Sequence, residues 1–450
     1  MPIPSRSSDP FASLVDERFG PIRSLRLLPH RHDLPSALRR AHAEVCDSSR
    51  FSAWHSDDRA GGFAWDSAAA ARAAAAGEAI ERYCGNLVPR TLRRASFAGL
   101  ETVGESAVDP VSLALFSDAQ YAQPGFPFVR FSRRLPVLWA RGRGMLDGRS
   151  VWVPASLVWV TFAGGRPTRA EPKVHATPYA GVAAGPDRAW AETAALLELV
   201  ERDALATAWQ GGEPLPSLRV PAWLAAKVSA PELRFDFHRV PSAFGVPVVA
   251  ALVHDLDRDL IALGVAARAE PTDAALKAAA EALQLLVTSR ILDDPTSDYM
   301  RRVAAGAPGL GVKPWRRDRA YRRLYDERWR DVWDLLSHLQ LYHDPTVRAP
   351  FVERLAHAPT LALDAIEPLR PGPQSTVRDE LVQRLATHGH APIALDLTTT
   401  DIAAAGFVVV RVVAPGLYGN APAAFPYLGG PRLERARTNG RLELRPLPYA

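Results

Sequence analysis

The chain has 450 residues, of which 47% are hydrophobic and 23% charged, as in an ordinary globular protein with a sizeable core. The formal net charge is only +5, which argues against a nucleic-acid-binding surface, and no apolar run is long enough to predict a transmembrane helix. The only cysteines, Cys46 and Cys84, exclude a disulfide scaffold and thiolate zinc sites, so we expect a protein of the reducing cytoplasm.

The N-terminal third begins with a predicted strand pair over residues 10–30, followed by a predicted helix over 33–43. Gly61-Gly62 indicates a loop. Asp66 or Ser67 then caps a long Ala-rich helix that ends near residue 85. Residues 110–165 follow a strand pattern, in the segments 128–131, 136–140, 150–154 and 157–162.

The rest of the chain alternates helices and strands. A second helix begins after Asp187 and a third runs over about 272–291, with predicted strands at 247–253 and 260–267 between them. Near the end, strands at 393–397 and 407–413 flank a short helix. Composition is even throughout, so we expect a single large α+β assembly of mixed sheets packed with Ala-rich helices. We divide it into an N-terminal part, 1–60, and a core with a Pro-rich tail, 61–450.

Two of these helices carry the same pentad, Glu-x-x-Glu-Arg, at 78–82 and 198–202. Positions i, i+3 and i+4 share one helix face, so each pentad gathers two carboxylates and one guanidinium on one stripe. The flanking residues are small or apolar, which indicates burial, and two buried carboxylates need a further cation or a hydrogen-bond network. A magnesium-bound triphosphate would satisfy them.

An ordinary solvated helix face with i,i+4 ion pairs is the alternative for either pentad alone. The recurrence of the pattern on two charge-poor helices favours a nucleotide and metal site. The sequence has no glycine-rich phosphate loop, Gly-x-Gly-x-x-Gly, Gly-x-Ser-x-Gly, His-Glu-x-x-His or Cys-x-x-Cys. A bound nucleotide would therefore be held by acidic helices.

Taken in order, the motifs resemble those of the YcaO family, and in particular of the azoline-forming peptide cyclodehydratase components of thiazole/oxazole-modified peptide (RiPP) natural product biosynthesis. The resemblance extends from about Leu14 to the C-terminus. Its segments are GEAIERYCG (77–85), VWVPASLVW (151–159), GVAAG (181–185), ALLELVERDA (195–204), EALQ (281–284), 394–417 and NAPAAFPYLGGPRL (420–433).

In that family the two acidic-arginine helices and a Glu-x-x-Gln helix surround ATP and its Mg²⁺ ions. The resemblance therefore implies four carboxylates close to the metal: Glu78, Glu81, Glu198 and Glu201. It also implies nucleotide-binding residues: Arg82 and Arg202 at the phosphates, with Glu281 and Gln284 completing the site. We read Cys84, beside the first pentad, as a packing residue.

The azoline-forming members end in a proline-rich tail that reaches the active centre. This chain ends RPLPYA (445–450), so the resemblance implies catalytic roles for Pro446 and Pro448; a frayed terminus is the alternative. The implied substrate is a ribosomal precursor peptide. We find no leader-binding domain before residue 60, so we expect a leader-binding partner protein of the E1-like, ThiF-like type. A homodimer is left open.

Three positions depart from the family pattern. Ala74 stands where a Ser is frequent, Tyr179-Ala180 where Ser-Asn is common, and Phe63 where an early Lys is often seen. These changes remove polar contacts to a nucleotide, which leaves a catalytically silent peptide-binding scaffold as an alternative. Within the enzyme class, thioamide or amidine formation is the other alternative. Every carboxylate and Arg of the two pentads is present, which favours the ATP-dependent cyclodehydratase.

Overall fold

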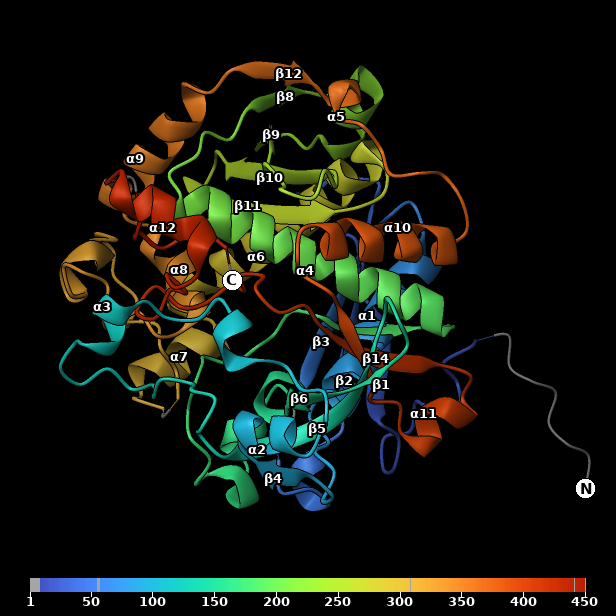
Figure 1. Cartoon of the computed structure of the whole chain (residues 1–450). Helices are drawn as coiled ribbons and strands as arrows, with labels where there is room; N and C mark the ends of the chain where they lie inside the picture. Colours follow the sequence, from blue (N-terminus) through green and yellow to red (C-terminus); the bar gives the residue numbers. More distant parts are fainter. Residues whose placement is uncertain (1–8, 55–56, 308, 441, 450) are drawn as a thin grey trace, which may run out of the picture.

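A computed structural model describes residues 9–54, 57–307, 309–440 and 442–449 (Figure 1). Three long helices, α1, α4 and α6, run through its middle, and shorter helices surround them. The helices of the described residues are α1 (Ala68–Cys84), α2 (Phe97–Thr102), α3 (Asp118–Tyr121), α4 (Arg188–Gln210), α5 (Ala222–Val228), α6 (Pro271–Leu292), α7 (Asp298–Ala304), α8 (Leu335–Leu341), α9 (Pro345–Ala356), α10 (Gln374–Thr387), α11 (Thr400–Ala404) and α12 (Pro431–Thr438).

The strands of the described residues form three sheets. The first has the order β1-β2-β3, the second β11-β10-β9-β8-β12, and the third β4-β5-β13-β14-β7 with β6 paired to β5. Their bounds are β1 (Ile22–Leu27), β2 (Leu38–Val45), β3 (Arg59–Trp65), β4 (Arg93–Ala95), β5 (Val137–Gly144), β6 (Ser150–Pro154), β7 (Val182–Gly185), β8 (Ser217–Arg219), β9 (Leu233–Arg239), β10 (Val248–Asp255), β11 (Leu260–Ala267), β12 (Thr360–Ala362), β13 (Ile393–Asp396) and β14 (Val408–Val413).

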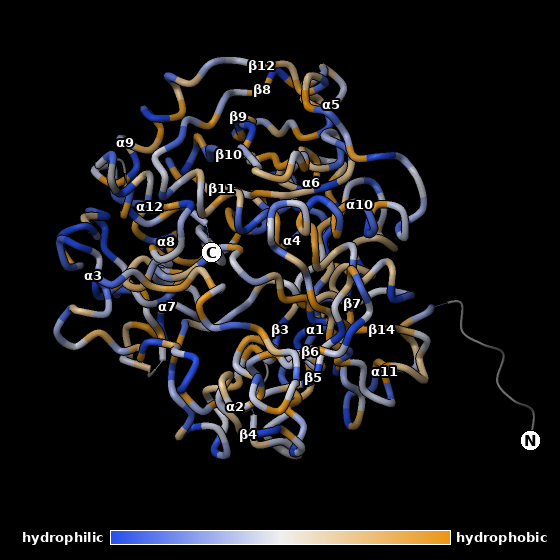
Figure 2. Tube along the Cα trace, viewed as in Figure 1, coloured by the Kyte–Doolittle hydropathy of each residue, from blue (hydrophilic) through white to orange (hydrophobic). Residues whose placement is uncertain are grey.

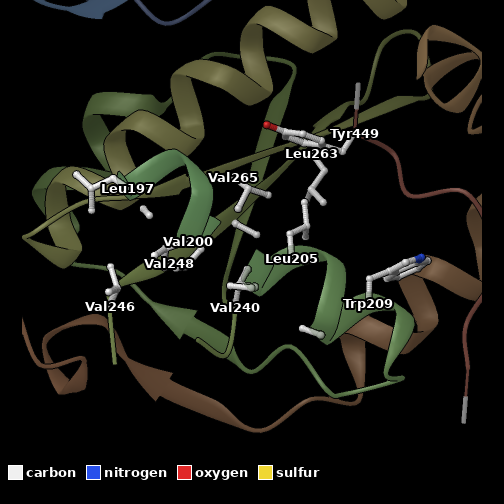
Figure 3. Packing of buried hydrophobic residues seen from close by; sticks show 14 of the residues in the cluster. Leu197, Val200, Leu205, Trp209, Val240, Val246, Val248, Leu263, Val265 and Tyr449 are labelled. Atoms are coloured by element: carbon white, nitrogen blue, oxygen red, sulfur yellow. The ribbon is translucent and has the colours of Figure 1, made fainter. Parts of the chain in front are cut away.

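Each long helix packs on a different sheet. α1 lies on β3 and β2, α6 on β11 and β10, and α4 on β14 and β7 with a further contact to β11. Figure 2 shows hydrophobic segments where these helices meet their strands. Around α4, Val200 and Leu205 pack beside Val265 of β11, and Tyr449 from the end of the chain joins the same cluster (Figure 3). Mixed helices and sheets confirm the predicted α+β class.

Two helix–sheet contacts depend on glycine because the backbones touch. A Cβ on Gly62 of β3 would lie 2.0 Å from the Ala71 carbonyl oxygen of α1, and a Cβ on Gly264 of β11 would lie 2.1 Å from the Ala278 carbonyl oxygen of α6. Backbone atoms cannot move aside as a flexible side chain can, so a methyl group here would push helix and sheet apart.

We therefore expect Gly264→Ala to lower the free energy of unfolding by about 3 kcal/mol, the scale of an overpacked core. Gly77→Ala is the matched control: Gly77 lies within α1 with nothing near its Cβ position, so alanine should raise stability by about 0.5–1 kcal/mol. Urea unfolding followed by circular dichroism would measure both. Equal stability of the two variants would contradict the close approach.

Five sequence-based predictions are wrong. Residues 10–30 do not form a strand pair; they hold one strand, β1, which pairs with β2. Residues 33–43 are not a helix; their second half enters β2, where buried side chains alternate. Gly61-Gly62 is not a loop but lies inside β3, where small residues allow α1 to approach. Residues 128–131 form no strand, because Phe128 packs in an aromatic cluster with Phe116 and Phe425 instead. Residues 157–162 form no strand; they join the 3-10 helices Ala155–Leu157 and Phe162–Gly164 by an irregular turn.

The proposed division at residue 60 falls inside β3, which pairs with β2 along its length. The residues before and after that point therefore share one sheet. In the part of the chain that the structure describes, no helix combines the length and hydropathy that a bilayer crossing needs.

Two buried histidines near α8 make stability depend on pH. Burial lowers the pKa of His343 to about 3, helped by the charges of Arg319 and Arg348, and burial lowers the pKa of His338 to about 4. His343 Nε2 lies 2.8 Å from Ser289 Oγ, so the neutral ring is hydrogen-bonded. Both rings are neutral in the folded protein at pH 5, whereas an unfolded histidine with a pKa of about 6.5 takes up a proton.

Their stabilising contribution is thus complete above pH 6.5 and is lost as the pH falls toward the folded-state values. We expect the free energy of unfolding to fall by about 2 kcal/mol per histidine between pH 7 and pH 5. His343→Gln keeps an acceptor for Ser289 and should make this fall smaller. Urea titrations at pH 7 and pH 5 check it; an unchanged pH dependence in the variant would refute the assignment.

Candidate nucleotide and metal site

A single cavity of about 1920 Å³ lies where α1, α4 and α6 meet. Every acidic, basic and amide residue predicted for the nucleotide and metal site lines it: Glu78, Glu81, Arg82, Glu198, Glu201, Arg202, Glu281 and Gln284. The two pentads, far apart in the sequence, thus face one space rather than bulk solvent. Their roles as ligands remain predictions.

The local sequence explains why both pentads face the cavity. Ser67 caps α1 by accepting a hydrogen bond from Ala70 N, and Asp187 caps α4 in the same way from Trp190 N. Small residues of α1 and a broader apolar stripe of α4 cover the opposite helix faces and are buried in the core. The charged stripe is therefore left toward the cavity.

Each pentad carboxylate accepts a hydrogen bond from a backbone N–H of a neighbouring segment. The first Glu of each pentad bonds the segment just before its own helix: Glu78 accepts from Gly61 N at 2.8 Å, and Glu198 accepts from Gly181 N at 2.9 Å. The second Glu of each pentad bonds a strand that comes later in the chain: Glu81 accepts from Ala184 N at 2.8 Å, and Glu201 accepts from Ala267 N at 3.0 Å. These bonds fix the carboxylates and help to offset their burial.

A threefold internal repeat explains this pattern. Three strand segments read Gly-Gly-Phe-Ala (61–64), Gly-Val-Ala-Ala (181–184) and Gly-Val-Ala-Ala (264–267), and each is followed 14 positions after its last Ala by the first Glu of a helix motif. The helix of unit one bonds the strand of unit two, and that of unit two bonds the strand of unit three. Gln284 of unit three lies beside the strand of unit one, since its Nε2 is 3.3 Å from a Cβ placed on Gly61.

The sequence analysis found the helix motifs but missed the strand repeat, although the sequence signal was present. The third unit differs from the other two. Gln284 and Leu285 stand where the pentads have Glu and Arg, and Lys277 forms an ion pair with Glu281 at 3.2 Å. Lys277 and Arg268 both line the cavity, so cations reach this corner from other positions.

Burial raises the pKa of the second Glu of each pentad. Burial raises the pKa of Glu81 to about 8, and the charges of Glu198 and Glu78 add to the rise. Burial raises the pKa of Glu201 as well, in spite of Arg202, with Glu281 and Glu198 contributing. A cation placed among these carboxylates would reverse the shift by favouring the charged forms.

The donor set fits a magnesium nucleotide. Glu201 Oε1 and Arg202 Nη1 are buried without a well-formed hydrogen bond, although they lie 3.1 Å apart. A carboxylate oxygen and a guanidinium nitrogen that each lack a well-formed hydrogen bond suit a ligand with both a cation and phosphate oxygens. Among the described residues, no group of three or more His, Cys, Asp or Glu could hold a metal by itself. Mg²⁺ would therefore need phosphate and water oxygens too.

The C-terminal tail lies against the same site, but not through its prolines. Neither Pro446 nor Pro448 lines the cavity; the Pro446 carbonyl accepts from Tyr342 Oη at 2.6 Å, and the Pro448 carbonyl accepts from Leu263 N at 3.2 Å. Tyr449 does line it, and its ring lies 4.6 Å from the Arg202 guanidinium carbon. The prolines thus hold the tail in place while the tyrosine reaches the pentad.

The departures from the expected pattern also fall on the cavity wall. Phe63, Ala74 and Tyr179 all line it. Lys277 on α6 stands four residues before Glu281, just as Ala74 stands four residues before Glu78 on α1. Lys277 thus places a cation at the position of α6 that Ala74 occupies on α1. Cys84 is buried beside Thr399, and burial raises the pKa of its thiol to about 11, which fits packing rather than catalysis.

A family model described as YcaO cyclodehydratase, ATP- and Mg²⁺-binding, matches residues 65–418. The chain belongs to the YcaO family. ATP and Mg²⁺, the cofactors expected from the sequence, are those of this family. YcaO membership also makes the chain an ATP-binding enzyme of this type. A search of curated protein sequences finds no match.

Solved structures share the YcaO fold at low identity. A heterocyclase in complex with substrate and cofactor has a TM-score of 0.66 at 16% identity, over 98% of this chain and 57% of that one. YcaO from Methanopyrus kandleri, bound with AMPPCP and Mg²⁺, has a TM-score of 0.58 at 20% identity, over 89% of each chain. The E. coli microcin synthetase McbBCD complex has a TM-score of 0.52 at 11% identity, over 88% of each chain. The chain spans 57% of the length of the heterocyclase solved with substrate and cofactor, which is little more than half.

Proposed function

We propose that this YcaO protein is an ATP-dependent cyclodehydratase that forms thiazolines or oxazolines from Cys, Ser or Thr of a ribosomal precursor peptide. The observation that carries the proposal is the convergence of both pentads and the Glu-x-x-Gln helix on one cavity of about 1920 Å³. That volume exceeds the 300–1,000 Å³ typical of a site for one small ligand, so a nucleotide leaves room for a peptide segment.

The chemistry explains why a nucleotide and a peptide share one site. A Cys, Ser or Thr side chain attacks the carbonyl carbon of the preceding amide, which leaves an oxyanion that would depart poorly as water. Transfer of the ATP γ-phosphoryl group to that oxygen makes it a phosphate, and elimination gives the ring. Phosphoryl transfer needs charge neutralisation and in-line placement more than a protein nucleophile.

The site residues divide these tasks by their chemistry. Carboxylates suit Mg²⁺, which would neutralise charge on the triphosphate, so we propose four metal-proximal ligands: Glu78, Glu81, Glu198 and Glu201. Arginine suits phosphate oxygens, so we propose Arg82 and Arg202 as phosphate partners, joined by Lys277. Glu281 and Gln284 complete the nucleotide site from α6.

We propose that the protein acts on a peptide substrate together with partner proteins. Similar structures are described as a heterocyclase with substrate and as a synthetase complex, which supports both. We propose a leader-binding protein, of the E1-like type, as the partner that delivers the precursor. Cytoplasmic thiazole/oxazole peptide biosynthesis is then the cellular setting.

Co-expression with a precursor peptide and a candidate partner tests the function. Mass spectrometry should show the loss of one water mass per ring, and phosphate release should match ring formation. Exchange of an amide oxygen for sulfur would instead indicate thioamide formation, and loss of water between a backbone amide and an amine would indicate an amidine. Binding of peptide without mass change or phosphate release would indicate a scaffold and overturn the proposal.

A further inference from the structure

A serine and a histidine in the cavity wall form a hydrogen-bonded pair that the nucleotide site does not use. Ser156 lies in the 3-10 turn Ala155–Leu157 after β6, and His175 lies in the loop before β7. Ser156 Oγ and His175 Nε2 are 2.9 Å apart, and both residues line the cavity. A hydroxyl held by an imidazole inside a substrate-sized space is a proton-transfer arrangement.

The surrounding contacts fix which ring nitrogen carries the proton. His175 Nδ1 lies 2.6 Å from the Ala176 carbonyl oxygen, which also accepts from Tyr427 Oη at 3.2 Å. A carbonyl oxygen can only accept, so Nδ1 is the protonated nitrogen. In a neutral ring Nε2 is then an acceptor, and the Ser156 hydroxyl donates to it. Ser156 Oγ therefore keeps lone pairs that can accept a hydrogen bond.

The loop that carries His175 is anchored and leads to the second carboxylate helix. Arg411 donates to the Pro178 carbonyl at 3.1 Å and thereby holds the loop that carries His175. The same loop ends at Gly181, whose N–H donates to Glu198. Burial, together with the Arg411 charge, lowers the pKa of His175 to about 4, so the ring is neutral at pH 7.

Several acidic groups of the cavity already pair with cations. Three cavity carboxylates pair with cations: Glu78 with Arg82, Glu198 with Arg202, and Glu281 with Lys277. Among the described residues that line the cavity, His175 is the sole histidine. No acidic side chain pairs with its ring in the described contacts, since both ring nitrogens are taken by the Ala176 carbonyl and the Ser156 hydroxyl.

We propose that Ser156 and His175 form the proton relay for the substrate nucleophile, an inference that rests on the proposed cyclodehydratase function. The substrate S–H or O–H donates to Ser156 Oγ. As its sulfur or oxygen bonds to the amide carbon, its proton passes to Ser156 Oγ, and the original Ser156 proton passes to His175 Nε2. The C=O π electrons move to the carbonyl oxygen, which takes the γ-phosphoryl group from ATP and releases ADP.

The second half of the reaction restores the pair. The C–O bond breaks with its electrons leaving on phosphate, the amide nitrogen lone pair forms the C=N bond, and the nitrogen loses its proton to solvent. His175 returns its proton through Ser156 to the departing phosphate. The net products are the azoline, ADP, phosphate and one proton, so no further reactant is required.

The nucleophile's own acidity provides the test, because a thiol with a pKa of about 8.5 needs a base far less than an alcohol does. The substrate is the precursor identified by water loss above, in two forms with Cys or Ser at the cyclised position. The variants are His175→Gln, which accepts a hydrogen bond but takes no proton, and Ser156→Ala. His238→Gln is the control, since His238 is a buried histidine outside the cavity.

We expect both relay variants to lower kcat for the Ser peptide by about 10²–10³-fold and for the Cys peptide by about 10-fold or less, the range of general-base catalysis. KM should stay within about 3-fold of the wild-type value. The rate of His175→Gln with the Cys peptide should recover between pH 7 and pH 9 as the substrate thiol ionises. The control His238→Gln should match the wild type. If the wild type cyclises only the Cys peptide, the recovery of the His175→Gln rate at pH 9 is the test of the relay.

Equal losses for the two peptides, a loss seen only in KM, or a Cys rate without recovery at pH 9 would each show that the pair merely shapes the cavity wall. Each of these results would overturn the relay and leave the proposed function standing. Absence of water loss and phosphate release in the wild type would instead remove the function, and the relay with it.

Discussion

Replacing Glu81 or Glu201 by Gln is expected to lower precursor-dependent phosphate release by roughly 10³-fold or more, since the metal–phosphate interaction is worth several kcal/mol. Glu201 is buried and Glu81 is partly buried, and each accepts one backbone hydrogen bond, from Ala267 N and Ala184 N respectively. A Gln oxygen can accept the same bond, so the fold should be retained. What the substitution removes is the negative charge that a magnesium ion requires.

Glu192→Gln is the matched control. Glu192 is a buried carboxylate of the same helix α4, but it pairs with Arg188 and Arg378 and does not line the cavity. Calorimetric titration with a non-hydrolysable ATP analogue and Mg²⁺ should show weakened binding in the two pentad variants and ordinary binding in the control. Unchanged phosphate release in both Glu81→Gln and Glu201→Gln would defeat the metal assignment.

Removing residues 446–450 is expected to slow cyclisation by about 10²-fold while nucleotide binding changes much less. The tail reaches the cavity through Tyr449, whose ring lies over Arg202, and a cation–π contact of this kind is worth about 1–2 kcal/mol when desolvated. Tyr449→Ala alone should therefore cost about 10-fold in kcat.

Because Leu447 and Tyr449 also pack on the core around α4, the deletion needs finer companions. Tyr449→Phe keeps the ring over Arg202 and should behave as the wild type. Tyr342→Phe removes the hydroxyl that donates to the Pro446 carbonyl. Its loss of cyclisation rate should be larger than that of Tyr449→Phe and smaller than that of the deletion. Parallel measurement of cyclisation and of nucleotide affinity decides the matter: equal losses of both would count against a role of the tail in the peptide reaction.

The long helices could be predicted because local patterns determine them. Ser67 and Asp187 are efficient caps, and apolar residues recur at helical spacing behind them, so α1 and α4 were expected close to their observed bounds. Strands β10 and β11 are continuous apolar runs and were equally clear. By contrast, β2 has a mixed pattern whose strand state depends on its pairing with β1 and β3.

The sequence by itself determined which side chains we propose for the chemistry, because the repeated Glu-x-x-Glu-Arg spacing places two carboxylates and an arginine on one helix face wherever that helix lies. Only the tertiary structure decided that α1, α4 and α6 face a common cavity, that Glu81 and Glu201 each reach the strand of the next unit, and that Tyr449 rather than a proline enters. Helix spacing is local, whereas these contacts join segments more than 60 residues apart, and their geometry depends on how three sheets pack.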